Sequence, residues 1–240
     1  MTIIFFSGNR HKAKEIEAIF TDAKVRIYTD FMDAFEVVEY GKSFAENAKI
    51  KLNVLKGAFE SQLDSNHKLR EINSEKIVLM AEDSGICVES LDNLPNIFSA
   101  RFANLPPLPL KNGESLEAIH NADSSDKDNI TRLISELQAR SLSESKAYFV
   151  SCVACYKIGN SFLCNHSADS TKQGNAQILT THGFLDGKVI CEVRGDNGFG
   201  YDPIFMPNGS QKTLGELSSE IKNTLSHRKN ALDLMRLLLK

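Results

Sequence analysis

The chain has 240 residues, of which 42% are hydrophobic and 25% are charged, a composition typical of a folded protein with one large domain or two small ones. Its formal net charge is −3, which argues against a broad basic surface for nucleic acid, so an anionic ligand would have to be held by local cations. The apolar N-terminal residues carry no basic leader, and the leucine-rich C-terminal stretch is too short to cross a bilayer, so we expect a cytosolic protein without a membrane partner.

The first part of the chain alternates between strand-like and helix-like segments. Apolar, β-rich runs predict strands at residues 2–6, 25–29 and 35–39. Apolar residues spaced three or four apart predict one helix after residue 9 and another after Ser43. The apolar faces of these two helices consist of Ala13, Ile16 and Phe20, and of Ala45, Ala48, Leu52, Leu55 and Phe59.

The middle of the chain is less regular. The polar stretch 61–75 is expected to be an exposed insertion, and strands are expected at 77–81 and 86–90. Residues 104–128 are rich in proline and small polar residues and are expected to form a long loop with a short helix. Asp126 is expected to cap the helix that follows. The apolar face of that helix consists of Ile130, Leu133, Ile134 and Leu137.

The last part of the chain predicts further strands and a closing helix. Residues 147–169 are typical of a hairpin of long strands that turns at Gly159–Asn160, and residues 187–193 predict another strand. A helix is expected after Ser226, which would be its N-cap. Its apolar face would consist of Ala231, Met235 and Leu238. No internal repeat or linker is visible, so we expect a mixed α/β fold in one compact unit.

The five cysteines are an odd number, which argues against a disulfide framework. Cys152 and Cys155 form a CxxC pair, but they lie in the strand-like segment "AYFVSCVACY". Residues three apart in a strand point to opposite faces. We therefore expect buried structural thiols, with a metal or redox role as the alternative.

The stretch "FFSGNRHKAKEI" places a glycine turn between a strand and the start of a helix. Free N–H groups and the positive end of the helix dipole make such a junction a natural phosphate site. Ser7 would add a hydroxyl, and Arg10 and Lys12 would add positive charge. The alternative is a tight turn with solvated basic side chains.

Two later segments carry acidic residues that could hold a metal ion. Ser43 and Glu46 match the capping-box pattern, so Glu46 could either cap its helix or reach a divalent ion. In "LMAEDSGICVES", Glu82 and Asp83 follow an apolar strand, where two adjacent acids need a cation or hydrogen-bond donors to compensate their charge. Mg²⁺ prefers such oxygen ligands. The alternative for Asp83 is a strand-end turn in which it bonds its own backbone.

Two segments near the C-terminus combine groups that could bind a ligand. "RGDNGFGYDPIF", at 194–205, places glycines, neighbouring aromatic rings and an aspartate on one bend, which is unlike a core strand or a solvent loop. In "EIKNTLSHRKNAL", His227 and Arg228 stand at a helix start, with Lys222 just upstream. Positive side chains there oppose the helix dipole, so they are better explained as donors to a ligand than as stabilising groups. The alternative is an exposed basic turn.

Together these segments resemble the inosine triphosphate pyrophosphatase family, also called Ham1-like proteins. The resemblance covers most of the chain and rests on "SGNRHKAKEI", "SFAENAKIK", "EDSGICVESL", "LPNIFSARFA", "RGDNGFGYDPIF" and "KTLGELSSEIKNTLSHRKNAL", in the family's order. It implies an α/β fold in which an elongated, mixed and twisted sheet is flanked by helices, with two lobes and an active-site cleft between them. It further implies a single domain over residues 1–240, a homodimer, and Mg²⁺-dependent hydrolysis of ITP, dITP and XTP to the monophosphate and pyrophosphate.

The resemblance also assigns roles to residues of this chain. Asp83 would be the proton acceptor, Lys12 would assist catalysis, and Glu46 and Asp83 would hold Mg²⁺. The triphosphate would contact Ser7, Gly8, Asn9, Lys12, Ser84 and Arg101. The base pocket would consist of Phe199, Gly200, Tyr201, Asp202, Lys222, His227 and Arg228.

The chain departs from the family's usual pattern at two positions. Ser7 stands where the family usually has threonine, and Glu82 replaces the first aspartate of the usual Asp-Asp-Ser-Gly. The chain is also longer than typical members, through polar insertions near 61–75, 104–128 and 159–175. Two other functions stay open: a nucleotide-binding protein without catalysis, and a phosphohydrolase of other modified nucleotides.

Overall fold

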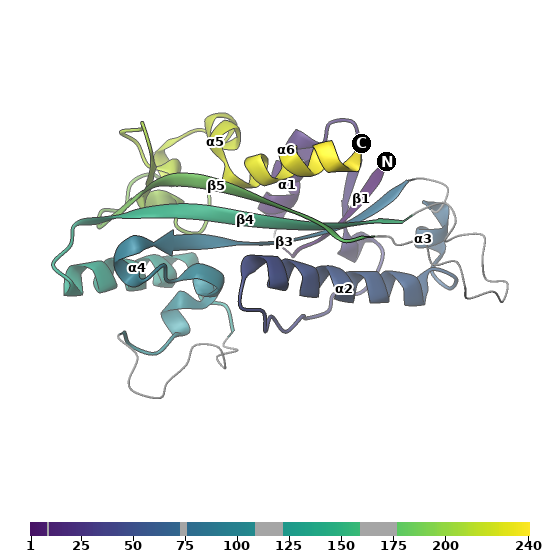
Figure 1. Cartoon of the computed structure of the whole chain (residues 1–240), viewed down its shortest axis with the longest axis horizontal. Helices are drawn as coiled ribbons and strands as arrows, with labels where there is room; N and C mark the ends of the chain where they lie inside the picture. Colours follow the sequence, from purple (N-terminus) through teal and green to yellow (C-terminus); the bar gives the residue numbers. More distant parts are fainter. Residues whose placement is uncertain (9, 73–75, 109–121, 159–176) are drawn as a thin grey trace. The chain divides into compact units, whose positions relative to one another are not determined.

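The structure is a computed structural model, and it describes residues 1–8, 10–72, 76–108, 122–158 and 177–240 (Figure 1). These residues form one six-stranded sheet with the strand order β2-β1-β3-β4-β5-β6. The strands are β1 (Thr2–Phe6), β2 (Lys24–Ile27), β3 (Ile77–Val88), β4 (Glu144–Ile158), β5 (Leu179–Ile190) and β6 (Phe205–Pro207). The helices are α1 (Arg10–Ile19), α2 (Phe44–Gln62), α3 (His67–Glu71), α4 (Asp126–Ala139), α5 (Ser219–Leu225) and α6 (His227–Leu239). Short 3-10 helices include η1 (Tyr28–Asp30), η2 (Glu89–Leu91), η3 (Asn96–Asn104), η5 (Asp202–Ile204) and η6 (Leu214–Glu216).

The sheet is mixed. Strand β1 pairs in parallel with β2 and with β3, whereas β5 and β6 pair antiparallel. Helices separate β1 from β2 and β2 from β3 along the chain, as parallel neighbours require. The predicted α/β class, with a mixed sheet flanked by helices, is confirmed.

The chain divides into two compact units. The first consists of Met1–Asp83, Cys152–His182 and Ala231–Lys240, and the second of Ser84–Ser151 and Gly183–Asn230. Strands β3, β4 and β5 each contain residues of both units.

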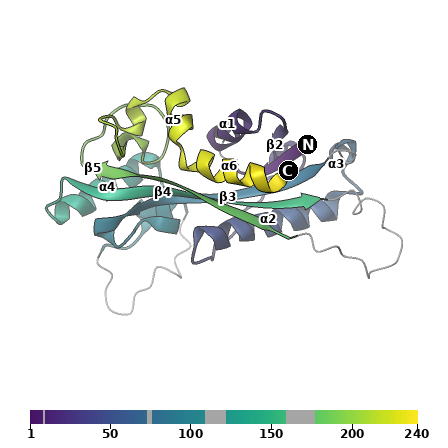
Figure 2. The same cartoon turned by 45° about the horizontal axis from the view of Figure 1, so that its top comes forward.

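In the first unit, helices cover both faces of the strands. Figures 1 and 2 show α2 on one face, and α1 together with the first-unit part of α6 on the other. Alternate residues of β1, Ile3 and Phe5, pack with Ile16 of α1 and Met235 of α6 in one buried cluster. Of the apolar stripe predicted for the second helix, Ala48, Leu52, Leu55 and Phe59 of α2 are fully buried, whereas Ala45 is only partly buried.

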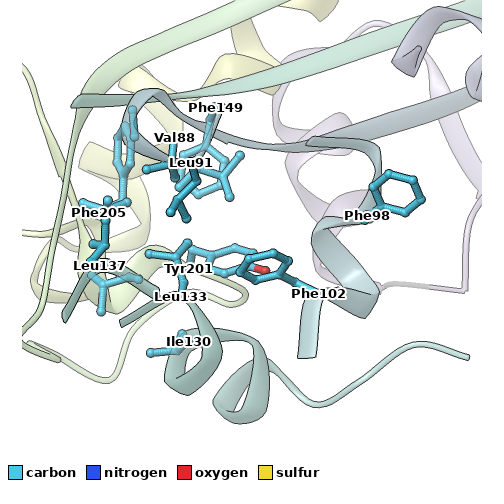
Figure 3. Close-up of a cluster of buried hydrophobic side chains, with 14 of the residues drawn as sticks. Val88, Leu91, Phe98, Phe102, Ile130, Leu133, Leu137, Phe149, Tyr201 and Phe205 are labelled. Atoms are coloured by element: carbon cyan, nitrogen blue, oxygen red, sulfur yellow. The ribbon is translucent and has the colours of Figure 1, made fainter. Parts of the chain in front are cut away.

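The second unit has its own apolar core, which Figure 3 shows in close-up. Leu133 and Leu137 of α4 pack there with Phe102 of η3 and Phe205 of β6. Helix α4 therefore presents the apolar face that its sequence predicts.

Two strand predictions are corrected. Residues 35–39 form no strand; Phe35 instead packs its ring 5.4 Å from that of Phe6 and 5.0 Å from that of Tyr28. The strands predicted at 77–81 and 86–90 are one continuous strand, β3. Glu82 and Asp83 looked like a strand end because charged pairs seldom lie inside a buried strand.

Other boundaries also differ from the prediction. The polar stretch 61–75 is partly folded into the core, since Leu63 and Leu69 are buried. The strand predicted at 187–193 is the end of β5, which stops at Ile190. The hairpin turn at Gly159–Asn160, the insertion near 159–175 and parts of the other two insertions lie outside the described residues.

The closing helix is confirmed, but not its whole apolar face. Ala231 and Met235 are fully buried, whereas Leu238 is 49% exposed and Leu232 is buried in its place. Two adjacent positions, 231 and 232, thus share the core side. Among the described residues, no helix combines the length and the apolar character needed to cross a membrane.

The CxxC residues are buried thiols, as expected. Cys152 and Cys155 lie in β4 and are both fully buried. Cys155 belongs to the apolar cluster of the first unit, together with Val153. Burial raises the pKa of Cys152 to about 12, so neither redox nor metal chemistry is favoured at this thiol.

Leu133→Ala should lower the free energy of unfolding by about 2–5 kcal/mol, because it opens a cavity in the core of the second unit. Leu133 is fully buried, whereas Leu237 is 63% exposed, so Leu237→Ala is the matched control. Chemical denaturation of both variants measures the effect, and equal losses would contradict the assignment of Leu133 to the core.

Candidate functional site

The turn after β1 is open on its outer side. Ser7 directly follows the strand, and Gly8 is exposed. A Cβ atom added at Gly8 would meet nothing within 4 Å, so there is room for a ligand against this backbone. Helix α1 begins at Arg10, which places its N-terminal N–H groups beside the turn. Asn9 lies outside the described residues.

Lys12 of α1 faces a buried acid of β3. Its Nζ lies 3.5 Å from Oε2 of Glu82, whose side chain is 1% exposed. A carboxylate buried to this extent needs a nearby cation. Lys12 therefore compensates the charge of Glu82, the residue that departs from the family's usual pattern.

Asp83 is held from the opposite helix. Its Oδ1 accepts a hydrogen bond from Nζ of Lys51 at 2.8 Å, and its Oδ2 accepts one from Nδ2 of Asn47 at 3.2 Å. Both partners belong to α2. The alternative in which Asp83 caps a strand-end turn is wrong, because Asp83 lies inside β3 and its carboxylate bonds side chains of α2.

The two adjacent acids thus serve opposite faces of the sheet. Consecutive side chains of a strand alternate, so Glu82 points to Lys12 of α1 and Asp83 to Asn47 and Lys51 of α2. The like charges are thereby separated, and each meets its own lysine. This arrangement makes Asp83 the acid on the α2 face, the helix that also carries Glu46 in its first turn.

Lys51 links two carboxylates. Its Nζ also lies 2.9 Å from Oε1 of Glu39. Burial disfavours the charged form of Lys51, but the carboxylates of Asp83 and Glu39 outweigh that effect, so the pKa of Lys51 is raised above its ordinary value. Lys51 is therefore a fixed positive charge beside Asp83.

Sequence reasoning missed Glu39, Asn47 and Lys51. Asn47 and Lys51 stand four positions apart on α2 and so share one face. The sequence signal was the position of Asn47 next to Ala48 of the apolar stripe, because an amide close to a buried face requires a hydrogen-bond partner. No signal of this kind marks Glu39, which lies in a segment without regular structure.

Glu46 lies in the first turn of α2, which Ser43 caps. Its backbone N–H donates to Oγ of Ser43 at 3.2 Å, and its own Oε2 accepts from the backbone N–H of Lys42 at 2.6 Å. The side chain is exposed at the start of α2. Ser43 is thus the N-cap, whereas the Glu46 carboxylate bonds Lys42 instead of completing a capping box with Ser43. The carboxylate lies at the surface, where a cation can also reach it.

The acids of the first unit suit Mg²⁺, an ion that needs few protein ligands, better than they suit a metal ion that is coordinated by protein side chains alone. Glu46 and Asp83 offer hard carboxylate oxygens from α2 and from the strand that α2 covers. Among the described residues, no group of three or more histidine, cysteine or acidic side chains could enclose an ion. Mg²⁺ commonly takes one or two carboxylates and completes its shell with water and phosphate oxygens, so the donor set fits that ion.

In the second unit, the bend at 198–202 is built around Asp202. Its Oδ2 accepts from the backbone N–H of Phe199 at 2.9 Å and pairs with Nζ of Lys222 at 2.8 Å. Gly198 has a φ of 85°, and a Cβ atom there would collide with the Asp202 carboxylate. Glycine is therefore required at this position.

The ring of Phe199 lies beside two cations. Nζ of Lys222 is 4.4 Å from its centroid, and Cζ of Arg228 is 5.8 Å from it. Arg228 is only 1% exposed, and its Nη2 lies 3.4 Å from Oγ of Ser84, the residue that follows Asp83 in the chain. These are donors fixed in a buried setting, so the alternative of an exposed basic turn is wrong.

The start of α6 is organised as predicted. Oγ of Ser226 accepts from the backbone N–H of Arg228 at 3.1 Å, which confirms Ser226 as the N-cap. His227 is 7% exposed and stacks on Phe149, with ring centroids 4.9 Å apart and an interplanar angle of 10°. The cap and the ring stack hold the two basic side chains in place.

Tyr201 and Gly200 are held by contacts with the rest of the second unit, whereas the ring of Phe199 lies beside two cations. The hydroxyl of Tyr201 donates to the backbone oxygen of Ser99 at 2.8 Å, and its ring lies in the apolar core (Figure 3). Burial raises the pKa of Tyr201 well above its ordinary value. Gly200 has a φ of 61°, and its N–H donates to Oδ2 of Asp126 at 2.7 Å.

The amides of Phe199 and Gly200 are therefore both engaged by carboxylates, those of Asp202 and Asp126. A ligand at this bend would find its hydrogen-bond donors on the side chains of Lys222 and Arg228.

Arg101 is a buried cation of the second unit. It is 9% exposed and lies at a kink of η3, with φ −130° and ψ 22°. Its guanidinium stands 5.4 Å from the ring centroid of Phe98. Among the described residues its Nε has no hydrogen-bond partner, which makes it a candidate donor to an anion.

Tyr201→Phe should lower the free energy of unfolding by about 0.5–1.5 kcal/mol, because it removes one buried hydrogen bond. The affinity for an inosine nucleotide, measured by equilibrium binding, should stay unchanged, since the hydroxyl contacts Ser99 in the core. A large loss of affinity with unchanged stability would place Tyr201 in the base pocket instead.

Comparison with known proteins agrees with these features. The model of the Ham1 family matches residues 3–237. The dITP/XTP pyrophosphatase of Nautilia profundicola is 38% identical over 240 residues, covering 100% of this chain and 98% of that protein. The dITP/XTP pyrophosphatase of Campylobacter hominis is 37% identical, covering 100% of this chain and 97% of that protein. The structure of the Staphylococcus aureus Ham1 protein matches with a TM-score of 0.69 at 28% identity, covering 100% of this chain and 98% of that one. The chain belongs to the Ham1 family.

Proposed function

We propose that the protein is a Mg²⁺-dependent nucleoside triphosphate pyrophosphohydrolase, which cleaves ITP, dITP and XTP to the monophosphate and pyrophosphate. The observation that carries this proposal is the buried carboxylate of Asp83, held at both oxygens by Asn47 and Lys51. A pure binding protein has no need for an acid kept in this way. The full-length match to proteins named dITP/XTP pyrophosphatase supports the substrate class.

Asp83 accepts the proton of the attacking water. A base must be ionised and fixed in position to do so. Lys51 at 2.8 Å and Asn47 hold the two oxygens of Asp83, which fixes the orientation of the carboxylate. Glu46 and Asp83 hold the metal, which supplies acidification of bound water and neutralisation of phosphate charge.

Several cations and hydrogen-bond donors of the chain bind phosphate. Lys12 and the N-terminal N–H groups of α1, with Ser7 and Gly8, form a preorganised electrostatic site for the triphosphate. The resemblance to the family adds Asn9 as a contact of the triphosphate. Arg101 and Ser84 are further candidate donors to phosphate. Removing one such contact typically costs on the order of 10²–10³ in rate.

Base selection follows from hydrogen-bond polarity. Hypoxanthine and xanthine present an acceptor at the 6-position, where adenine presents an amino donor. The donors of Lys222, His227 and Arg228 suit the acceptor, and Phe199 offers an aromatic face. A buried donor left unpaired by adenine costs about 1–3 kcal/mol, and several together reject ATP strongly.

With Mg²⁺ present, the purified protein should release pyrophosphate from ITP roughly 10² times faster than from ATP, the ratio expected from unpaired donors in the base site. GTP shares the 6-oxo group and should be refused at its 2-amino group. A panel of nucleotides assayed for pyrophosphate and orthophosphate measures both preferences.

Equal turnover of ITP, ATP and GTP would contradict the base selection, and binding without turnover would favour the nucleotide-binding alternative. Preferred turnover of a modified pyrimidine nucleotide, or orthophosphate as the product, would favour another phosphohydrolase.

Asp83→Asn should lower kcat by at least about 10², because the amide cannot accept the proton, while the fold persists. Glu60→Gln is the control for changing an acid to an amide: Glu60 pairs with Lys56 on α2 and touches no proposed ligand of the metal or the phosphates, so kcat should not change. Steady-state kinetics with ITP and circular dichroism measure both effects. A fully active Asp83→Asn variant would remove Asp83 from the mechanism.

The resemblance to the family further supports a single functional domain over both units, a homodimer, and action in the cytoplasm, where nucleoside triphosphates are made and used. The family model spans residues of both units, which supports the first of these proposals.

A further inference from the structure

We propose that Asp126, at the start of α4, is a positioning residue that holds the Phe199–Gly200 bend in the conformation that binds the base. The inference rests on the proposed function, since it concerns the base site of that reaction.

Asp126 is not needed to cap its own helix. It was expected to be the N-cap, but the structure assigns that position to Ser125, whose Oγ accepts from the backbone N–H of Asp128 at 3.1 Å. Asp126 is the first helical residue instead. Its carboxylate accepts from the backbone N–H of Gly200 at 2.7 Å, across 74 positions of the chain.

The first turn of α4 is itself firmly anchored. Asn129 is 3% exposed, and its Oδ1 accepts from the backbone N–H of Ala103 at 2.9 Å. Its Nδ2 donates to the backbone oxygen of Ala100 at 3.1 Å. Residues 100 and 103 flank Arg101 in η3, so the same helical turn that carries Asp126 also fixes the backbone around a predicted phosphate ligand.

Two carboxylates therefore clamp the peptide groups around Phe199. Asp202 accepts from the N–H of Phe199, and Asp126 accepts from the N–H of Gly200. Between these two bonds the backbone has little freedom to rotate the ring away from Lys222 and Arg228. Gly200 itself, with a φ of 61°, lacks the side chain that would otherwise restrict it.

The two clamps differ in strength. Asp202 is buried and paired with Lys222, so its removal would disrupt the core of the bend. Asp126 is exposed, and its hydrogen bond to Gly200 can open without unfolding anything else. Loss of Asp126 should therefore reduce the fraction of molecules with a binding-competent bend, which weakens apparent affinity by that fraction.

The test compares Asp126→Ala, Asp126→Asn and Asp128→Ala with the wild-type chain. Asp126→Ala should raise KM for ITP about three- to tenfold, the range that loss of one solvent-exposed hydrogen bond allows, with kcat within about twofold. Asp126→Asn keeps an acceptor oxygen and should restore most of the affinity.

Asp128→Ala is the control. It removes an acid from the same helical turn, where Asp128 bonds Ser125 rather than the bend, so KM should not change. Both alanine variants weaken the helix start alike, which separates positioning from stability.

Hydrogen exchange of the Gly200 amide provides a second readout that needs no substrate. Asp126→Ala should accelerate this exchange, and Asp128→Ala should not. Equal KM values and equal exchange rates for the two alanine variants would overturn the inference. A wild-type chain that leaves ITP intact would contradict the proposed function, whereas the exchange comparison would still decide whether Asp126 holds the bend.

Discussion

Two adjacent carboxylates buried inside one strand set the constraint on which the rest of the site depends. Glu82 and Asp83 of β3 are 3% and 7% exposed, and charges in such a position destabilise a fold unless each is compensated. The strand separates them onto opposite faces, and each face supplies a lysine, Lys12 from α1 and Lys51 from α2. The helices flanking this strand are therefore tied to it by charge as well as by apolar packing.

The second unit repeats this principle at its own bend. Asp202 is buried, and Lys222 compensates its charge while the carboxylate also fixes the backbone of Phe199. In both units an acid is thus buried beside functional groups, and a lysine forms an ion pair with that acid. Tyr201 lies in the same bend but has a structural role. Its ring packs in the core of the second unit, and its hydroxyl donates a hydrogen bond to the backbone oxygen of Ser99.

Periodic apolar spacing predicted the helices α1, α2, α4 and α6, because burial of one helix face leaves a clear pattern in sequence. The continuity of β3 was not predictable in this way, since its acids are compensated by lysines from distant segments. The same holds for Asn47 and Lys51, whose role depends on β3 passing beside α2. The contact of Asp126 with Gly200 was hidden for a further reason: a helix start with several polar residues does not reveal which one is the cap. Family motifs supplied the candidate site residues, and only the fold shows that Tyr201 belongs to the core while Phe199 lies beside Lys222 and Arg228.

The central claim, that Lys51 compensates a buried charge on Asp83, is tested most directly by a double-mutant cycle on the free energy of unfolding. Lys51→Met alone should destabilise the protein by about 3 kcal/mol or more, because it leaves Asp83 without its cation. Adding Asp83→Asn to that variant should recover a large part of the loss, which gives a coupling energy of about 1–3 kcal/mol. Additive effects of the two substitutions would contradict the account.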